Sequence, residues 1–261
     1  MPALFFSLVE KWPFARAMAA REMRSSNKGS VLGLGWNVVR PFIQVAIYVV
    51  IVTYIFGARL SATAGPYDYA LFVLSGLFGW QILQRGLEDS TSLIRDRMEI
   101  LKQVVYPIET LPITTFLASA IGPGVVLLAY LLLAAIGGKL SWTVLLLPIP
   151  LTLLLLLILG LSWTFMVVGV ILKDTREIIS VLLGLTIYLS PVLLSPTMVP
   201  PRIWSLILLN PMSHVIIAFR DVFEGTFHPI SWAVFVVGVV AALGIGSIVI
   251  TRAKVTINEY L

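Results

Sequence analysis

Six long apolar stretches dominate the chain, and they restrict it to one class of fold. Hydrophobic residues fill 59% of its 261 positions and charged residues only 12%, about half of the roughly 25% found in soluble domains. A helix needs about 20 apolar residues to cross a bilayer. The sequence therefore predicts an all-α integral membrane protein with six transmembrane helices in a single domain, residues 41–261. The predicted spans are Pro41–Gly57, Tyr69–Gln84, Ile113–Ile136, Val144–Leu172, Ile178–Leu194 and Trp232–Ile250.

Basic residues are distributed unevenly between the connections of these spans. Six lie in residues 1–40, four follow the second span, two follow the fourth and two follow the sixth, whereas the alternate connections hold four in total. Cytoplasmic segments carry an excess of Lys and Arg. The pattern therefore predicts that both termini are cytoplasmic.

Residues 1–40 are expected to form a cytoplasmic segment with an amphipathic helix at the membrane interface. At 3.6 residues per turn, one face would carry apolar side chains and the opposite face basic ones. The apolar set is Trp12, Phe14, Ala15, Met18, Ala19 and Met23, and the basic set is Arg16, Arg21, Arg24 and Lys28. The alternative interpretation is a poorly ordered basic leader that only sets the topology.

The segment Ser190–Pro229 is too apolar for a water-exposed loop and too interrupted for one helix. Its two apolar runs, Ile203–Leu209 and Val215–Phe219, are far shorter than a span and are flanked by six prolines, which remove backbone donors and break helices. Broken backbone at membrane depth is tolerated where protein buries it or where it lines a wet cavity. The sequence predicts a re-entrant helical pair between spans five and six, with residues 195–230 as a periplasmic gate over a pathway.

Residues 85–110 are the one sizeable polar block, predicted to be cytoplasmic. Within it, Arg95–Lys102 is expected to form a short charged helix with an apolar side, as a docking surface for a soluble partner would have. A helix lying against the membrane is the alternative. The carboxylates here alternate with arginines, so solvated ion pairs are favoured over acid–base catalysis.

Several kinds of chemistry have no sequence support. The chain has no cysteine, two histidines and no phosphate-binding loop, so neither a metal site nor ATP hydrolysis is expected in it. Its spans hold almost no ionisable residue, which argues against transport driven by protons. The chain is therefore predicted to be a non-enzymatic conduit moved by a partner.

Candidates for the wall of the conduit lie on the first span. Their spacing of four, three and four residues places them on one helix face; they are Gln44, Tyr48, Ile51 and Ile55, and Tyr188 is a further aromatic candidate. Ordinary packing or interface anchoring is the alternative for each. In the last span, Gly238, Ala242 and Gly246 are four residues apart, a pattern of close helix contact either in a dimer or inside one protomer.

A series of short fragments, in this order, resembles a known family over nearly the whole chain. The fragments are Lys28–Gly33 with Trp36, Tyr106–Pro112, Lys173-Asp174, Ser190–Val192, Asn210–Met212 and Phe219–Asp221. The chain resembles the permease subunit of type-2 ABC exporters of bacterial polysaccharides such as O-antigen, capsule and teichoic acid. It departs from the family at Asn27, Ile108 and Lys173, where an aromatic, a basic residue and an arginine are usual.

The resemblance implies a homodimer of permeases in the bacterial inner membrane with two ATPase subunits that hold ATP and Mg. The cargo would be a lipid-linked polysaccharide, with O-antigen expected first, and the other contacts would be membrane lipids and no nucleic acid. Coupling to the ATPase would fall on Arg95, Asp96, Arg97, Glu99 and Lys102, and the outer gate on Pro191, Asn210, Pro211, Arg220 and Asp221. The alternatives are an exporter of a smaller lipo-oligosaccharide or drug-like cargo, and a membrane enzyme acting on lipid carriers.

Overall fold

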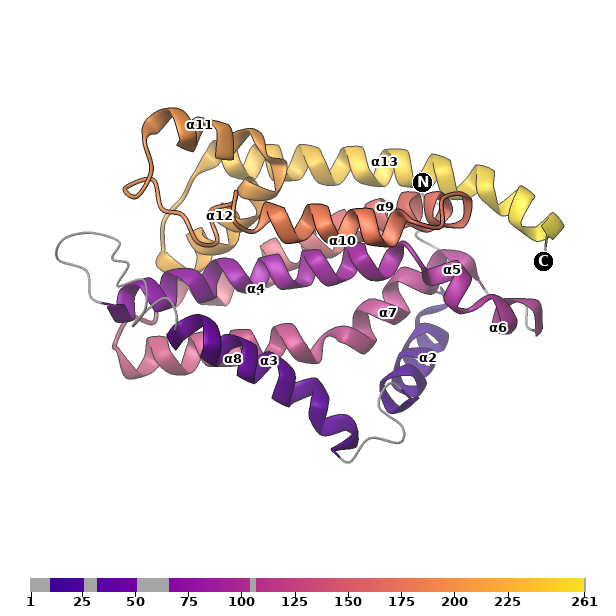
Figure 1. The fold of residues 1–261 in the computed structure, drawn as a ribbon, viewed down its shortest axis with the longest axis horizontal. Helices are drawn as coiled ribbons and strands as arrows, with labels where there is room; N and C mark the ends of the chain where they lie inside the picture. Colours follow the sequence, from indigo (N-terminus) through magenta and orange to yellow (C-terminus); the bar gives the residue numbers. More distant parts are fainter. Residues whose placement is uncertain (1–9, 26–31, 51–65, 104–106, 261) are drawn as a thin grey trace.

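The computed structural model describes residues 10–25, 32–50, 66–103 and 107–260 (Figure 1). Within these ranges the fold is helical and contains no strand, so the all-α class predicted from the sequence is confirmed. The α-helices are α2 (Trp12–Ser25), α3 (Trp36–Val50), α4 (Pro66–Ser90), α5 (Leu93–Asp96), α6 (Met98–Gln103), α7 (Leu111–Ser119), α8 (Ile121–Ile136), α9 (Pro148–Ile171), α10 (Thr175–Thr186), α11 (Pro201–Leu209), α12 (Pro211–Glu224) and α13 (Pro229–Tyr260). The 3₁₀ helices are η1 (Gly33–Gly35), η3 (Ile108–Thr110) and η4 (Trp142–Leu146).

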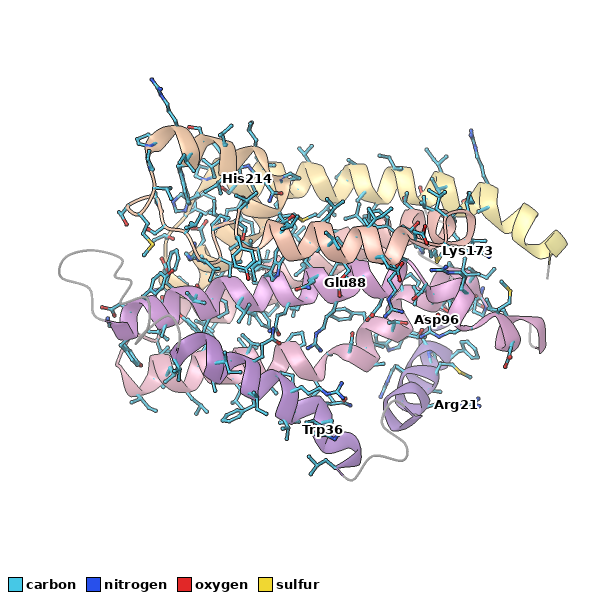
Figure 2. All side chains as sticks on the ribbon, in the orientation of Figure 1. Arg21, Trp36, Glu88, Asp96, Lys173 and His214 are labelled. Carbon is cyan, nitrogen blue, oxygen red and sulfur yellow. The ribbon has the colours of Figure 1, made fainter. Side chains whose placement is uncertain are left out.

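The long helices run side by side and give the molecule two distinct ends (Figure 1). One end carries α2, α5, α6, α7 and the last turns of α13, and the other carries α11 with the first turns of α4 and α13. Arg21, Asp96 and Lys173 all lie at the first end (Figure 2). The predicted cytoplasmic connections thus gather on one side of the fold, and the direction in which they face across a membrane stays a prediction.

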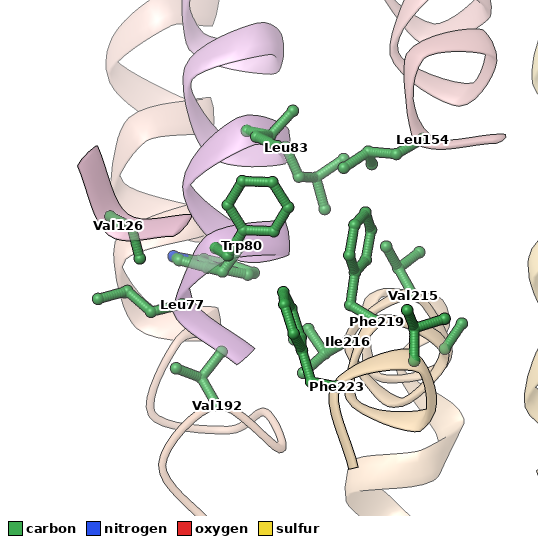
Figure 3. Close-up of a cluster of buried hydrophobic side chains, with 14 of the residues drawn as sticks. Leu77, Trp80, Leu83, Val126, Leu154, Val192, Val215, Ile216, Phe219 and Phe223 are labelled. Atoms are coloured by element: carbon green, nitrogen blue, oxygen red, sulfur yellow. The ribbon is translucent and has the colours of Figure 1, made fainter. Parts of the chain in front are cut away.

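Helix α4 is the centre of the fold. Every side chain from Tyr69 to Leu83 is buried, because α8, α9, α10 and α12 pack around the helix. On its α12 side, the ring of Phe78 meets Phe219 and Phe223 edge-to-face at centroid distances of 5.6 and 6.0 Å. Such aromatic pairs add about 0.5–1.5 kcal/mol beyond burial. Figure 3 shows Phe219 and Phe223 in the cluster of buried side chains beside Trp80 of α4. The aromatic residues in the middle of α4 therefore serve packing.

Helices α9 and α13 make the most extensive helix contact of the described chain. At Gly246 a Cβ would lie 2.9 Å from the carbonyl carbon of Gly160 and 3.1 Å from its Cα, so only glycine permits this approach. A Cβ on Gly160 would in turn meet the backbone of Ala242, whereas a Cβ on Gly238 would meet nothing within 4 Å. Two members of the predicted small-residue row thus pack inside the protomer, as small residues do where membrane helices approach closely.

The predicted number of six spans is not confirmed. Among the described residues, Trp142–Ile171 and Pro229–Ala253 are each long and apolar enough to cross a membrane. Two bent pairs, α7 with α8 (45°) and α11 with α12 (100°), pass the same test when each is joined. Helices α3 and α10 have 15 and 12 residues, and the predicted first span continues from α3 into residues outside the described ranges. Helix α4, with 25 residues, is long enough to cross a membrane, but it is not among the helices that are also apolar enough. Neighbouring helices cover α4, so its surface need not be apolar throughout.

The broken segment has the local structure that its prolines predict. Helix α10 ends at Thr186, eight residues before the expected end of span five, and turns follow as far as Pro200. Pro191 and Pro196 lie in these turns and lack the donors that would continue the helix. Two short helices, α11 and α12, then meet at an angle of 100°. Their existence matches the predicted pair, and their re-entry into the membrane stays a prediction.

The predicted amphipathic helix forms as α2 and packs against α7. Ala15 and Ala19 are buried in this contact, whereas Arg16 and Arg21 are exposed. The apolar face is therefore covered at least in part by protein, and its contact with the membrane stays a prediction. Met23, Arg24 and Lys28 have side chains or backbone outside the described part of the chain.

Candidate functional site

A cavity of about 790 Å³ lies under the short helices, at the end of the molecule opposite α5 and α6. Its walls come from the start of α4, from α8, from α11 and α12, and from the start of α13. Small-molecule sites in proteins typically have about 300–1,000 Å³. The lining includes seven acidic, basic or imidazole side chains: Asp68, Lys139, His214, Arg220, Asp221, Glu224 and His228.

Arg220 fastens α12 to two distant segments. Its Nη2 donates hydrogen bonds to the carbonyl oxygens of Pro191 (2.7 Å) and Phe72 (3.2 Å). Its guanidinium carbon lies 3.5 Å from the centroid of the Phe72 ring, a cation–π geometry. Nε lies 3.6 Å from the carboxylate of Glu224 and makes no hydrogen bond. A buried charge is costly without such partners, so Arg220 holds α4, the Pro191 turn and α12 in one arrangement.

Asp221 connects the end of α12 to the start of α13. Its side chain is almost fully buried and accepts four hydrogen bonds. The donors are Thr226 Oγ1 (2.8 Å), the backbone N–H of His228 (2.8 Å), His228 Nδ1 (2.6 Å) and Trp232 Nε1 (2.9 Å). Gly225 ends α12 with φ of 73°, a conformation that glycine adopts at no steric cost. The predicted gate residue Asp221 is thus a rigid junction between two helices.

The sharp bend between α11 and α12 has a local cause. Asn210 is the N-cap of α12, and its Oδ1 accepts from the backbone N–H of Met212 at 3.0 Å. Pro211 occupies the first position of the helix, where its missing donor costs nothing. His214 then donates from Nε2 to the carbonyl of Leu208 (2.9 Å) and pairs through Nδ1 with Ser231 (3.1 Å). A lone histidine carries no sequence signal for this role, so sequence reasoning did not find it.

The structure brings the predicted gate residues together. Pro191 and Arg220 are in direct contact, Asp221 follows Arg220, and Asn210 and Pro211 begin the helix that carries both. Sequence reasoning did not assign Lys139, Glu224 and His228 to this site, although they line the same cavity. The role of the predicted residues, Pro191 to Asp221, as an outer gate stays a prediction.

At the opposite end, the predicted coupling helix forms as two pieces, α5 and α6, with Arg97 between them. Arg95 donates from Nη1 to the carbonyl of Lys173 (3.0 Å), and Arg97 donates from Nη2 to Thr115 Oγ1 (2.7 Å). The carboxylate of Asp96 accepts from Ser92 Oγ at 2.7 Å. Arg95 and Arg97 thus bond to distant segments and Asp96 to its own turn, and the predicted solvated ion pairs stay a prediction.

Two further coupling candidates lie on α6. Glu99 is exposed, and it makes no contact of this kind with the described part of the chain. Lys102 belongs to the same helix, and its side chain lies outside the description. Glu99 therefore leaves a charge on α6 available to another molecule, and exposed Arg16, Arg21 and Lys173 lie at the same end.

Helix α2 is tied to the same end by an ion pair. Lys11 Nζ lies 3.1 Å from the carboxylate of Glu109, whose side chain is only 5% exposed. The backbone oxygen of Glu109 also accepts from Trp163 Nε1 at 3.1 Å. The Tyr106–Pro112 fragment thus links α2, η3 and α9.

The candidates for the conduit wall are only partly described. Gln44 is exposed on α3, and Tyr188, just after α10, is 65% exposed. Tyr48 lies on α3 with its side chain outside the description, and Ile51 and Ile55 lie outside the described residues altogether. The exposed side chains of Gln44 and Tyr188 can contact lipid, a pathway or a second copy of the chain, so their role stays a prediction.

Comparison with known proteins agrees with the family resemblance. The O-antigen export system permease protein RfbA of Klebsiella pneumoniae is 24% identical over 214 residues, covering 80% of this chain and 79% of the relative. RfbA of Myxococcus xanthus is 26% identical, covering 79% and 78% respectively. The polysialic acid transport protein KpsM of Escherichia coli is 26% identical, covering 78% and 79%.

The chain is related to bacterial polysaccharide export permeases. No protein-family model matches it. The resemblance predicted from the ordered fragments is confirmed, and the apolar helices agree with a multi-pass membrane protein of bacterial type.

Proposed function

We propose that the chain is the permease subunit of an ATP-driven type-2 ABC exporter that moves a lipid-linked polysaccharide across the bacterial inner membrane. The observation that carries the proposal is relatedness across about four-fifths of both chains to permeases named for two different polysaccharides, O-antigen and polysialic acid. Polysaccharide export is what these relatives share. O-antigen is the proposed cargo, because three of the matched relatives carry that name.

The energy source is proposed to be a separate pair of ATPase subunits on two copies of the permease. The sequence has no phosphate-binding loop, so ATP and Mg would be held by the partner. The proposed contact is the exposed side of α6 with Glu99, next to Arg95 and Arg97, which anchor α5 and α6 to the rest of the fold. An anchored surface can pass on a partner's movement, because its side chains bond to other segments. The contact with the ATPase subunits would place α6 on the cytoplasmic side of the membrane, and both termini are proposed to lie on that side.

The polysaccharide would pass between the two copies, and α11 and α12 would form the outer gate. Support comes from the position of the short helices at the end opposite α6 (Figure 1). Wall candidates for this path remain Gln44, Tyr48, Ile51, Ile55 and Tyr188.

Deleting the gene tests the cargo. The deletion strain should lose one surface polysaccharide while its lipid-linked precursor accumulates on the cytoplasmic side, and the cloned gene should restore display. A strain that still displays every surface polysaccharide would refute the proposal. Loss of drug resistance or of a short lipo-oligosaccharide, with long polysaccharides intact, would favour the smaller-cargo alternative.

Charge reversal at Glu99 tests the partner contact. Glu99→Lys should lower polysaccharide-linked ATP hydrolysis of the purified complex by roughly tenfold, since like-charge juxtaposition across an interface costs more than about 1 kcal/mol. Arg252→Glu, a charge reversal at an exposed position of α13 outside α6 and the gate segment, is the control and should leave coupling intact. Unchanged hydrolysis and export in Glu99→Lys would reject this side of α6 as the contact.

A further inference from the structure

We propose that the cavity under α11 and α12 is a binding site, complete within one copy of the chain, for a neutral sugar segment of the exported glycan. The inference rests on the proposed function, because it identifies the cavity's ligand as part of that cargo. The lining residues on which the proposal rests all belong to one chain, so the proposed site does not need a residue from a second copy.

The cavity is large enough to hold a ligand. Its volume of about 790 Å³ falls within the range of about 300–1,000 Å³ that is usual for small-molecule sites. Arg220 and Asp221 fix its floor through bonds to α4, the Pro191 turn and α13. The walls are thus held in place before any ligand arrives, which reduces the entropy lost on binding.

The charges of the lining favour a neutral ligand over a phosphate. Each cationic group lies against a carboxylate: Lys139 pairs with Asp68, and Arg220 lies near Glu224. His228 contacts the carboxylate of Asp221. A phosphate or pyrophosphate would have to compete with these carboxylates for the same cations. Hydroxyl groups would not, because they both donate and accept hydrogen bonds.

Trp204 provides a partly exposed aromatic surface. It lines the cavity from α11, and its ring makes no hydrogen bond or ring contact with the described part of the chain. The other rings of the lining are engaged, since Arg220 covers Phe72 and Tyr130 packs on Phe223 at 4.3 Å. A sugar ring has an apolar face of C–H groups, which suits contact with a flat indole that has an apolar body and a polar edge.

Polar groups next to these aromatic walls match the hydroxyls of a sugar. The Nε of Arg220 is buried and makes no hydrogen bond, so it is a donor that lacks a short acceptor. The carboxylate of Glu224, 42% exposed and 3.6 Å from this Nε, is an acceptor. This carboxylate can accept hydrogen bonds from sugar hydroxyls, whereas the buried Nε of Arg220 lies out of reach of a ligand and serves the wall of the site.

Cysteine protection tests the site, because the chain has no native cysteine. Ile230→Cys places a thiol on the cavity lining at an exposed position. The labelling rate of this thiol by a water-soluble maleimide is measured on the purified complex with its ATPase. The probes are short oligosaccharides released by mild acid from the bacterium's own surface polysaccharide and, separately, inorganic pyrophosphate. The control Ile203→Cys carries a thiol on α11 outside the lining.

Oligosaccharides should slow labelling of the Ile230→Cys variant about fivefold at four times their half-protecting concentration, and should not slow that of Ile203→Cys. Adding Trp204→Ala should raise the half-protecting concentration about tenfold, whereas Trp204→Phe, which keeps a ring, should change it less than about threefold. Absence of protection, equal protection of the control, or protection by pyrophosphate as strong as by the oligosaccharides overturns the inference. Polysaccharide display is scored in the same strains: normal display without protection removes this site and leaves the proposed function standing.

Discussion

The close approach of α9 and α13 predicts that Gly246→Ala destabilises the protein. A Cβ at this position would lie 2.9 Å from the carbonyl carbon of Gly160, whereas carbon atoms pack at about 3.5–4.0 Å. The helices would therefore have to separate by roughly 0.6 Å or more along their most extensive contact. Overpacking of this kind costs about 1–3 kcal/mol.

A matched control on the same helix isolates that cost. Gly238→Ala adds the same methyl group where a Cβ would meet nothing within 4 Å, so it gains only the helix propensity of alanine over glycine, about 0.8–1 kcal/mol. The difference between the two variants should therefore be about 1–3 kcal/mol, or roughly 2–10 °C in the midpoint of thermal unfolding. The midpoint is measured on detergent-purified protein. Equal midpoints for the two variants would refute the close approach of α9 and α13.

Three further predictions concern the polar contacts. Arg220→Met should lower stability by about 1–3 kcal/mol by leaving the buried carbonyls of Pro191 and Phe72 without their donor, seen as a lower thermal midpoint; a midpoint equal to that of wild type would contradict the clamp by Arg220. Asp221→Asn should cost about 1–3 kcal/mol, because its amide group turns donors toward the donors of His228 and Trp232; an unchanged midpoint would show that these bonds are dispensable. Glu109→Lys should destabilise the contact of α2, and the double variant with Lys11→Glu should recover about 1 kcal/mol or more, measured as a coupling energy; strictly additive effects would show that the ion pair contributes nothing.

Local signals in the sequence were sufficient to predict the broken segment. Asn210 and Pro211 are a capping residue and a first-turn proline, so the start of α12 can be read from two adjacent residues. The end of α10 was placed too late, because the apolar run continues through turns that only Pro191 and Pro196 interrupt. The charged helix at Arg95–Lys102 was expected as one piece, whereas the structure divides it into α5 and α6 at Arg97. At this break Arg95 and Arg97 donate hydrogen bonds to residues distant in the sequence.

The cavity could not be predicted in the same way, because its contacts join residues far apart in the chain. Arg220 binds Phe72, 148 positions away, and Pro191, 29 positions away, and no local pattern specifies such pairs. The resemblance drew attention to Ser190–Val192 and Phe219–Asp221 as separate fragments. The structure adds that Pro191 and Arg220 touch. The partner of the small-residue row on α13 was likewise undecided from the sequence, since a glycine spacing does not say which helix it faces.

Helix α4 has a consequence for how movement could travel through the protein. It is a continuous rod of 25 residues, about 37 Å long, with Phe72 and its arginine at one end and the short α5 at the other. A tilt of about 5° about its midpoint would displace its two ends by about 1.6 Å in opposite directions. Because Arg220 binds α12 to α4, α11 and α12 would move together with α4 in such a tilt and would not move independently of it.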